Sequence, residues 1–136
     1  MLKTLSLPTH QKTEIIDITP QVQAIVTESG IQDGVAIIYV PHTTAAVLIQ
    51  ENADPAVHTD LLNTLDRLVP QDLPYLHQTV NKNAPSHIKA ALIGPSKTVF
   101  ICNGQIQLGR YQFIYICEFD GPRSRQVWVR VMQDAA

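Results

Sequence analysis

The stretch YQFIYICEFDGPRSRQVWVRVM, residues 111–132, decides the fold class of this chain. Its first part, residues 111–119, is almost entirely apolar or aromatic, which is typical of a buried strand. Asp-Gly-Pro at 120–122 is a turn sequence. Beyond the turn, valine recurs at every second position and so faces one side of a strand: Val127, Val129 and Val131. The sequence therefore predicts two long strands, over 111–119 and 126–132, of which the second returns beside the first.

Similar patterns predict strands elsewhere in the chain. Alternating or β-branched segments indicate strands over residues 3–7, 13–19, 34–40, 44–49 and 98–102. Asn103-Gly104 predicts a tight turn after the last of these strands. Because these strands are short and two to three helices separate some of them, we expect an α+β fold. Its β-sheet should be largely antiparallel and sandwich-like or barrel-like.

The helices are predicted from their caps and apolar spacing. The first begins with Thr19 as its N-cap and ends at Gly30. The second follows Asp54 as its N-cap, and four apolar residues at helical spacing should form its buried stripe: Val57, Leu61, Leu65 and Leu68. A short third helix covers about 84–92, after an irregular segment over 69–83 of a length usually associated with function.

Length and composition limit the class of protein. The 136 residues and 15.1 kDa predict one domain spanning residues 1–136. The net charge of −2 argues against nucleic acid as a partner. No apolar run approaches the ~18–20 residues that span a bilayer, and we see no signal peptide. We therefore expect a cytoplasmic protein with no membrane partner, in which Cys102 and Cys117 are buried free thiols.

Charge is divided unevenly along the chain. Residues 1–72 contain nine acids and three bases, whereas residues 73–136 contain three acids and seven bases. The two halves, or two subunits, could be electrostatically complementary. Alternatively, a cleft could combine carboxylates from the first half with anion-binding arginines from the second.

Three of the five histidines lie where predicted elements meet: His42, His77 and His87. Neutral imidazole is a common metal ligand and a common proton shuttle, so a convergent trio could form a metal or acid–base centre. His87 lies in the first turn of the third helix, where the helix dipole disfavours the imidazolium. Each of the three could instead be an ordinary surface histidine. The other two are interpreted as surface residues: His10 and His58.

Two acids and two arginines are candidates for the same site. Glu51 closes the strand that follows His42, and Asp60 lies close to the buried stripe of the second helix. Arg123 and Arg125 are two residues apart at the start of a strand, so both face one side and could hold a phosphate. Surface acids and inter-strand salt bridges are the alternative interpretations. The sequence contains no P-loop, nucleophile elbow or zinc motif, so spacing alone indicates a metal only weakly.

Nine segments together resemble the YjbQ family over about residues 13–131. They are His42-Thr43-Thr44-Ala45, Glu51-Asn52-Ala53-Asp54-Pro55, Asp60-Leu61, Tyr75-Leu76-His77, Asn83-Ala84-Pro85-Ser86-His87-Ile88-Lys89, Gly94-Pro95-Ser96, Asn103-Gly104, Gly109-Arg110-Tyr111-Gln112 and Gly121-Pro122-Arg123-Ser124-Arg125. YjbQ proteins are small trimers with reported secondary thiamine-phosphate synthase activity. Two departures are Arg110-Tyr111, where the family usually has Thr-Trp, and Gln50, where it usually has Asn.

The resemblance implies a YjbQ-like fold, a homotrimer with sites near its interfaces, and a small phosphorylated metabolite as ligand. The implied reaction joins a pyrimidine diphosphate to a thiazole phosphate and releases pyrophosphate. Substrate binding is assigned to Thr44, Asn83, Arg123 and Arg125, and catalysis to His42, Glu51, Asp60, His77, His87 and Gln112. A divalent metal would be held by His42, His77 and His87.

Three imidazoles suit a zinc-like ion better than the magnesium expected with pyrophosphate. We therefore expect the synthase reaction to be a secondary activity. Two further hypotheses are a zinc-dependent hydrolase and a non-catalytic trimer that binds a metabolite or metal.

Overall fold

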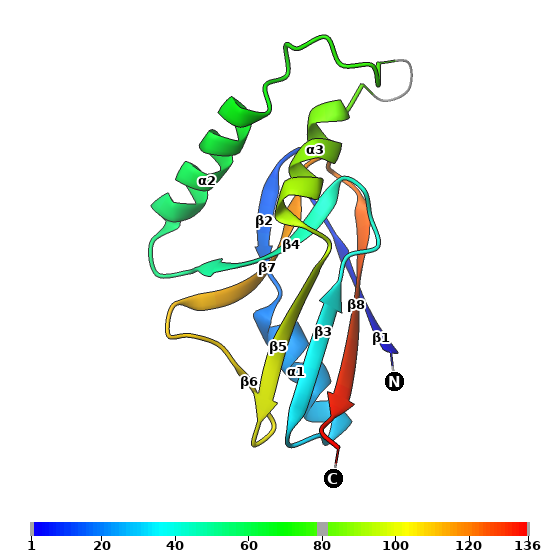
Figure 1. The fold of residues 1–136 in the computed structure, drawn as a ribbon, viewed down its shortest axis with the longest axis vertical. Helices are drawn as coiled ribbons and strands as arrows, with labels where there is room; N and C mark the ends of the chain where they lie inside the picture. Colours follow the sequence, from blue (N-terminus) through cyan, green and yellow to red (C-terminus); the bar gives the residue numbers. More distant parts are fainter. Residues whose placement is uncertain (1, 79–81, 136) are drawn as a thin grey trace.

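The computed structural model describes residues 2–78 and 82–135, and it contains eight strands and three helices in these ranges (Figure 1). Their order is β1 (Leu2–Pro8), β2 (Glu14–Asp17), α1 (Thr19–Ser29), β3 (Gly34–Tyr39), β4 (Ala45–Glu51), α2 (Pro55–Leu68), α3 (Ala84–Ile93), β5 (Ser96–Cys102), β6 (Gln105–Gln107), β7 (Gln112–Glu118) and β8 (Ser124–Gln133). This is the α+β class that the sequence predicts.

The strands form two antiparallel sheets. The five-stranded sheet has the order β1-β8-β3-β5-β6, and the three-stranded sheet has the order β2-β7-β4. The expected return of β8 beside β7 is wrong, because β7 pairs with β2 and β4 whereas β8 pairs with β1 and β3. The turn over 120–122 therefore crosses from one sheet to the other. The tight turn at Asn103-Gly104 is confirmed, and both residues have positive φ.

The main core contains one face of each sheet and the inner face of α1. The three alternating valines of β8 all lie in this core, as the sequence predicts. Val22 and Val26 of α1 are fully buried against it. The helix ends at Gly30 with φ 73°, as expected. Its predicted N-cap is wrong: Thr19 is already helical, and the Asp17 carboxylate accepts a hydrogen bond from the Thr19 amide at 2.8 Å.

The helix α2 covers the molecule less closely than its apolar spacing predicts. The Asp54 side chain caps it as expected, accepting from the Ala56 amide at 2.9 Å. Of the four stripe residues, only Leu65 is buried, and Leu68 is 69% exposed. His58 is not a simple surface residue, because its Nε2 lies 2.6 Å from the Glu51 carbonyl oxygen. Figure 1 shows α2 at the same end of the molecule as α3.

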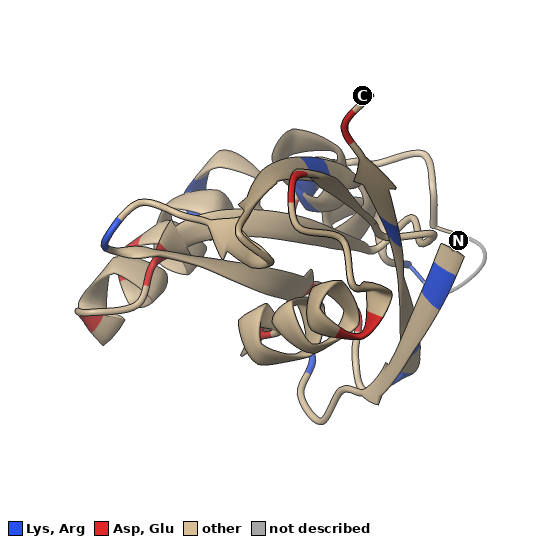
Figure 2. Cartoon of the chain, turned by 90° about the horizontal axis from the view of Figure 1, so that it is seen from below, with Lys and Arg blue, Asp and Glu red and all other residues tan. Residues whose placement is uncertain are grey.

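Charged residues are sparse and of both signs over the ribbon (Figure 2). None of the helices in the described part of the chain is long and apolar enough to cross a membrane. Both cysteines are free, but only Cys117 is buried, so the expectation of two buried thiols is wrong for Cys102. Cys102 is exposed because it lies on the face of β5 opposite to the core residue Ile101.

Candidate functional site

One polar cavity of about 460 Å³ brings together seven of the residues selected from the sequence. They are His42, Thr44, His77, Asn83, His87, Arg123 and Arg125. These residues come from three places in the chain: the β3–β4 connection, the segment before and at the start of α3, and the β7–β8 connection with the first residues of β8. The cavity therefore depends on tertiary structure rather than on one local motif.

Two connections that cross between the sheets meet at this cavity. The β3–β4 connection passes from the five-stranded to the three-stranded sheet, and the β7–β8 connection passes back. They are joined by backbone, since the Phe119 amide donates to the Thr44 carbonyl at 3.1 Å. The start of α3 is fixed to the same place, because Ser86 Oγ donates to the Phe119 carbonyl at 2.6 Å. The backbone therefore holds the three contributing segments together.

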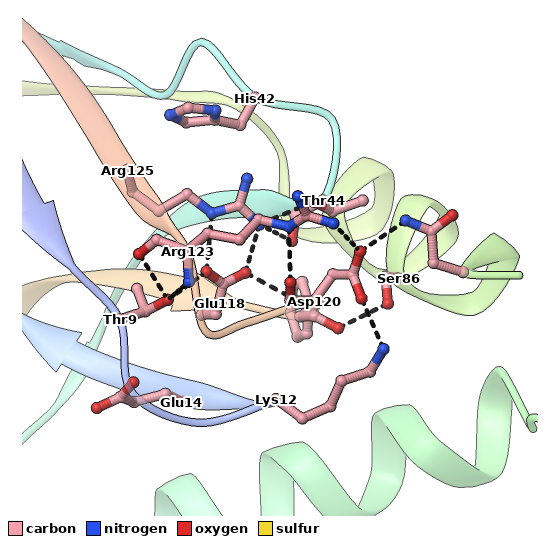
Figure 3. A network of polar contacts seen from close by, with 12 residues as sticks. Thr9, Lys12, Glu14, His42, Thr44, Ser86, Glu118, Asp120, Arg123 and Arg125 are labelled. Atoms are coloured by element: carbon pink, nitrogen blue, oxygen red, sulfur yellow. Dashed lines mark hydrogen bonds and ion pairs between the residues drawn. The ribbon is translucent and has the colours of Figure 1, made fainter. Parts of the chain in front are cut away.

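Arg125 is held by a buried carboxylate. Its Nε donates to Glu118 Oε1 at 2.8 Å, its Nη2 donates to Glu118 Oε2, and Nη2 also donates to Thr44 Oγ1 at 2.8 Å (Figure 3). Glu118 is fully buried, and Arg125 is 4% exposed. Burial alone would raise the pKa of Glu118, but hydrogen bonds from Arg125, Thr9 and the Asp120 amide outweigh it and lower the pKa. The pair is therefore ionised at neutral pH.

The carboxylate of Asp120, in the β7–β8 connection, accepts hydrogen bonds from three side chains. Lys12 Nζ lies 2.6 Å from Oδ1, while Arg123 Nη2 at 2.8 Å and Asn83 Nδ2 at 2.7 Å donate to Oδ2. Burial acts to raise the pKa of Asp120, but the hydrogen bonds from Lys12, Arg123 and Asn83 lower it to about 2. The Arg123 side chain stays 45% exposed, so a ligand in the cavity can reach it.

His42 is held through its ring nitrogen. The Gln126 amide donates to His42 Nε2 at 2.9 Å. Burial is the main cause that lowers the pKa of His42, and the positive charge of Arg125 lowers it further. His42 is therefore neutral at pH 7.

His77 and His87 lie against each other in the wall of the cavity. Their ring centroids are 5.2 Å apart in an edge-to-face arrangement. His77 Nε2 lies 3.0 Å from Asn83 Oδ1, which links this ring to the Asp120 carboxylate. A second, mainly apolar cavity of about 490 Å³ shares both rings, and its other lining residues are Tyr75, Leu76, Ala84 and Ile88.

Three of the selected residues do not line the cavity: Glu51, Asp60 and Gln112. Glu51 and Gln112 are paired across β4 and β7. Glu51 lies seven residues beyond Thr44, a distance of roughly 20 Å along a strand. Gln112 Oε1 accepts from the Gly109 amide at 2.7 Å, and Asp60 is exposed on α2.

The acids that do meet the arginines were not selected from the sequence. Both carboxylates and both arginines come from residues 118–125. The carboxylates beside the arginines therefore do not come from the acidic first half of the chain, as one of the two alternatives for the uneven charge required. Glu118 interrupts an apolar run, and a buried charge requires a partner. The arginines just beyond the turn were suitable partners. Lys12 and Thr9, which come from the β1–β2 region, had no such signal in the sequence.

The donors of a single chain do not fit the expected three-histidine metal centre. In residues 2–78 and 82–135, no group of three or more His, Cys, Asp or Glu side chains could hold a metal ion. His42 Nε2 and His77 Nε2 already take part in hydrogen bonds, and Glu118 and Asp120 are occupied by cationic side chains. Metal binding by His42, His77 and His87 stays a prediction from the sequence.

The charges of the site favour an anion over a cation. Its two arginines and Lys12 outnumber the carboxylates of Glu118 and Asp120 by one positive charge. Within the described residues, each arginine uses Nε and Nη2 for its protein partners, and its Nη1 has no protein partner. These Nη1 groups are well suited to phosphate oxygens.

Comparisons with known proteins agree with the fold. The family model described as UPF0047 protein YjbQ-like matches residues 3–134. The UPF0047 protein MJ1081 of Methanocaldococcus jannaschii is 42% identical over 134 residues, which are 98% of this chain and 96% of that protein. UPF0047 protein YugU of Bacillus subtilis is 45% identical over 132 residues, which are 97% and 99% of the two chains.

Solved structures resemble the whole chain as well. An uncharacterized YjbQ/UPF0047 family protein from Clostridium acetobutylicum has a TM-score of 0.91 and 46% identity, with 96% of this chain and 99% of that chain covered. A protein of unknown function from Sulfolobus solfataricus has a TM-score of 0.93 and 29% identity, with 98% and 97% covered. This chain therefore belongs to the YjbQ/UPF0047 family and has the α+β fold of that family.

Proposed function

We propose that the polar cavity binds a small phosphorylated metabolite. The observation that supports this most strongly is the meeting of Arg123, Arg125 and three histidines in one cavity with an excess of positive charge. A phosphate group has several acceptor oxygens. The Nη1 groups of both arginines, which have no partner among the described residues, are suitable donors. Neutral His42 adds one further N–H without repelling the arginines.

The candidate reaction is thiamine-phosphate synthesis as a secondary activity. Its substrates carry a diphosphate and a monophosphate, and the leaving pyrophosphate develops negative charge that Arg123 and Arg125 would stabilise. The mainly apolar cavity beside His77 and His87 has room for the ring of one substrate. The reaction itself is inferred from the family resemblance. The polar cavity and the adjoining apolar cavity support it because they could hold the phosphate groups and a substrate ring.

A turnover assay tests this reaction. Purified protein is incubated with the pyrimidine diphosphate and the thiazole phosphate, and both thiamine phosphate and pyrophosphate are measured. We expect turnover by the parent, and at least a tenfold loss for Arg123→Gln and for His87→Ala, because each removes a group that faces the cavity. Arg67→Gln, on the exposed surface of α2, is the matched control and should keep the parental rate. Absence of product from the parent, or equal rates for all four proteins, would reject the synthase activity.

A non-catalytic binding protein is the second candidate function. One observation favours it: both arginines are paired with carboxylates. The pairing fixes the arginines in place for binding, and it also occupies the carboxylates, which are then not available as a general base. Binding of pyrophosphate without any turnover would support this function over the synthase.

We also propose that the chain assembles as a homotrimer through the outer face of the five-stranded sheet. Several large apolar side chains on this face are exposed: Leu2 at 46%, Tyr39 at 42%, Phe100 at 69% and Met132 at 47%. Tyr39 also stacks with Trp128 at a centroid distance of 5.8 Å. Exposed apolar patches of this kind often mark an interface between subunits.

A further inference from the structure

Two histidines of the cavity are fixed in opposite tautomers by their partners. A backbone N–H can only donate, so the Gln126 amide requires His42 Nε2 to be the unprotonated ring nitrogen. The single proton of this neutral ring must therefore be on Nδ1. His42 thus has one N–H donor, on a ring that lines the cavity.

The tautomer of His77 follows from a chain of three groups. The Asp120 carboxylate can only accept, so the NH₂ group of Asn83 must face it, as it does at 2.7 Å. The carbonyl oxygen of the same amide then faces His77 Nε2 at 3.0 Å. An amide oxygen can only accept, so His77 Nε2 must be protonated. In the neutral ring, Nδ1 is therefore the unprotonated nitrogen, and no other residue within 2–78 and 82–135 donates a hydrogen bond to it.

We propose that Asn83 and Asp120 are positioning residues that make His77 Nδ1 the hydrogen-bond acceptor of the cavity, whereas His42 is a donor. Asp120 anchors the relay because Lys12 and Arg123 keep it ionised (Figure 3). Asn83 transmits this orientation to the ring. Asn83 is only 5% exposed, so solvent does not compete for its two contacts.

This assignment narrows the class of ligand and rests on the proposed binding function. Arginines and His42 offer donors only, which suits an anion. An acceptor at His77 among these donors suits an anion that also has an O–H or N–H group, such as a phosphate with one proton, or a phosphorylated molecule with a hydroxyl or amino group. An anion without a proton would leave His77 Nδ1 without a partner.

The first test is the tautomer of each ring by ¹⁵N NMR at about pH 7.5, through couplings between ring carbon-bound protons and ring nitrogens. His→Gln variants assign the signals. We expect a protonated Nδ1 for His42 and a protonated Nε2 for His77. The opposite tautomer at either ring would overturn the proposal, whether or not the cavity binds a ligand.

The second test is Asn83→Leu, which removes the relay with little change in side-chain volume. We expect the His77 Nε2 proton to exchange faster with water and the ring to sample both tautomers, while His42 stays unchanged. The matched control is Asn63→Leu on the exposed surface of α2, which should change neither ring. An unchanged His77 in the Asn83 variant would contradict the relay, and the spectrum of the parent decides the assignment if this variant does not fold.

The third test separates the acceptor role from anion binding. Inorganic phosphate keeps at least one O–H at this pH, whereas sulfate keeps none. We expect phosphate, but not sulfate, to shift the His77 Nδ1 resonance, while both anions shift signals of the Arg123 side chain. Equal shifts of Nδ1 by both anions would overturn the acceptor role. If neither anion shifts any cavity signal while the tautomers are as assigned, the proposed binding function fails and the tautomer assignment stands.

Discussion

At the scale of single residues, Glu118 and Asp120 determine how the cations of the cavity are placed. Glu118 holds Arg125 on two nitrogens, and Asp120 holds Lys12 and Arg123. Breaking a buried pair by removing one partner costs roughly 3–5 kcal/mol, whereas an exposed pair such as Lys3 with Glu28 is worth about 0–1 kcal/mol. The carboxylates therefore matter for stability as well as for binding.

The low pKa of Asp120 predicts that the free energy of unfolding decreases in acid. Its folded pKa of about 2 lies below the ordinary value of 3.8, so its ionised form stabilises the folded state above about pH 4. This contribution, about 2 kcal/mol, is lost as the pH falls from about 4 to about 2. Urea unfolding at pH 5 and at pH 2 gives the loss of unfolding free energy between the two pH values. We expect this loss to be about 2 kcal/mol smaller in Asp120→Asn than in the parent. Asp60→Asn, on the exposed surface of α2, is the control and should lose as much unfolding free energy as the parent. If Asp120→Asn also loses as much as the parent, the role of Asp120 is contradicted.

At the scale of elements, the β7–β8 connection is the most constrained part of the site. Gly121 lies in this turn, and a Cβ added to it would meet the Gln11 carbonyl oxygen at 2.1 Å. Its amide also donates to the Lys12 carbonyl at 3.0 Å. The turn therefore lies directly against the β1–β2 loop, which brings Thr9 and Lys12 to the site.

Gly121→Ala should destabilise the protein and disturb the site together. Because the atom in the way is backbone, one of the two loops must move, and we expect a loss of about 2–3 kcal/mol in unfolding free energy. Gly109→Ala is a suitable control, since its new Cβ would meet only the flexible Gln112 side chain, at 3.1 Å. Denaturant unfolding measures both variants. Equal stability of Gly121→Ala and the parent would show that the close approach is not rigid.

Local elements could be predicted from the sequence, but their pairing could not. The Asn103-Gly104 turn, the Asp54 cap and the alternating face of β8 follow from short-range chemistry. The separation of β7 and β8 into different sheets depends on partners far away in the chain, and no local pattern encodes them. The α2 stripe was only partly predicted because apolar spacing does not say how closely a helix is covered.

The candidate site was predictable to a similar extent. The histidines and arginines could be selected because their residue types and positions at element ends are informative. The sequence favours Glu51 over Glu118 because Glu51 closes the strand that follows His42. Tertiary structure instead places Glu118 beside the arginines. The sequence could not show that the histidines and arginines line one cavity, because this depends on where the β3–β4 and β7–β8 connections cross between the sheets.

At the scale of the whole molecule, a substitution on the outer face of the five-stranded sheet tests the proposed homotrimer. Phe100→Glu places a charge at the most exposed apolar side chain of this face and should release monomers, because burying an unpaired charge in an interface is costly. Light scattering should give about three times 15.1 kDa for the parent and 15.1 kDa for the variant. Leu68→Glu on α2 is equally exposed, at 69%, and should leave the trimer intact. A monomeric parent would reject the trimer, and a trimeric Phe100 variant would reject this face.

The central claim is that the cavity binds a phosphorylated ligand, and calorimetric titration with pyrophosphate tests it most directly. We predict saturable binding by the parent at one site per chain, at least tenfold weaker binding by Arg123→Gln, and parental binding by Arg67→Gln. The binding should weaken with added salt because it is largely electrostatic. Absence of saturable binding by the parent, or equal affinity of the Arg123 and Arg67 variants, would contradict the account.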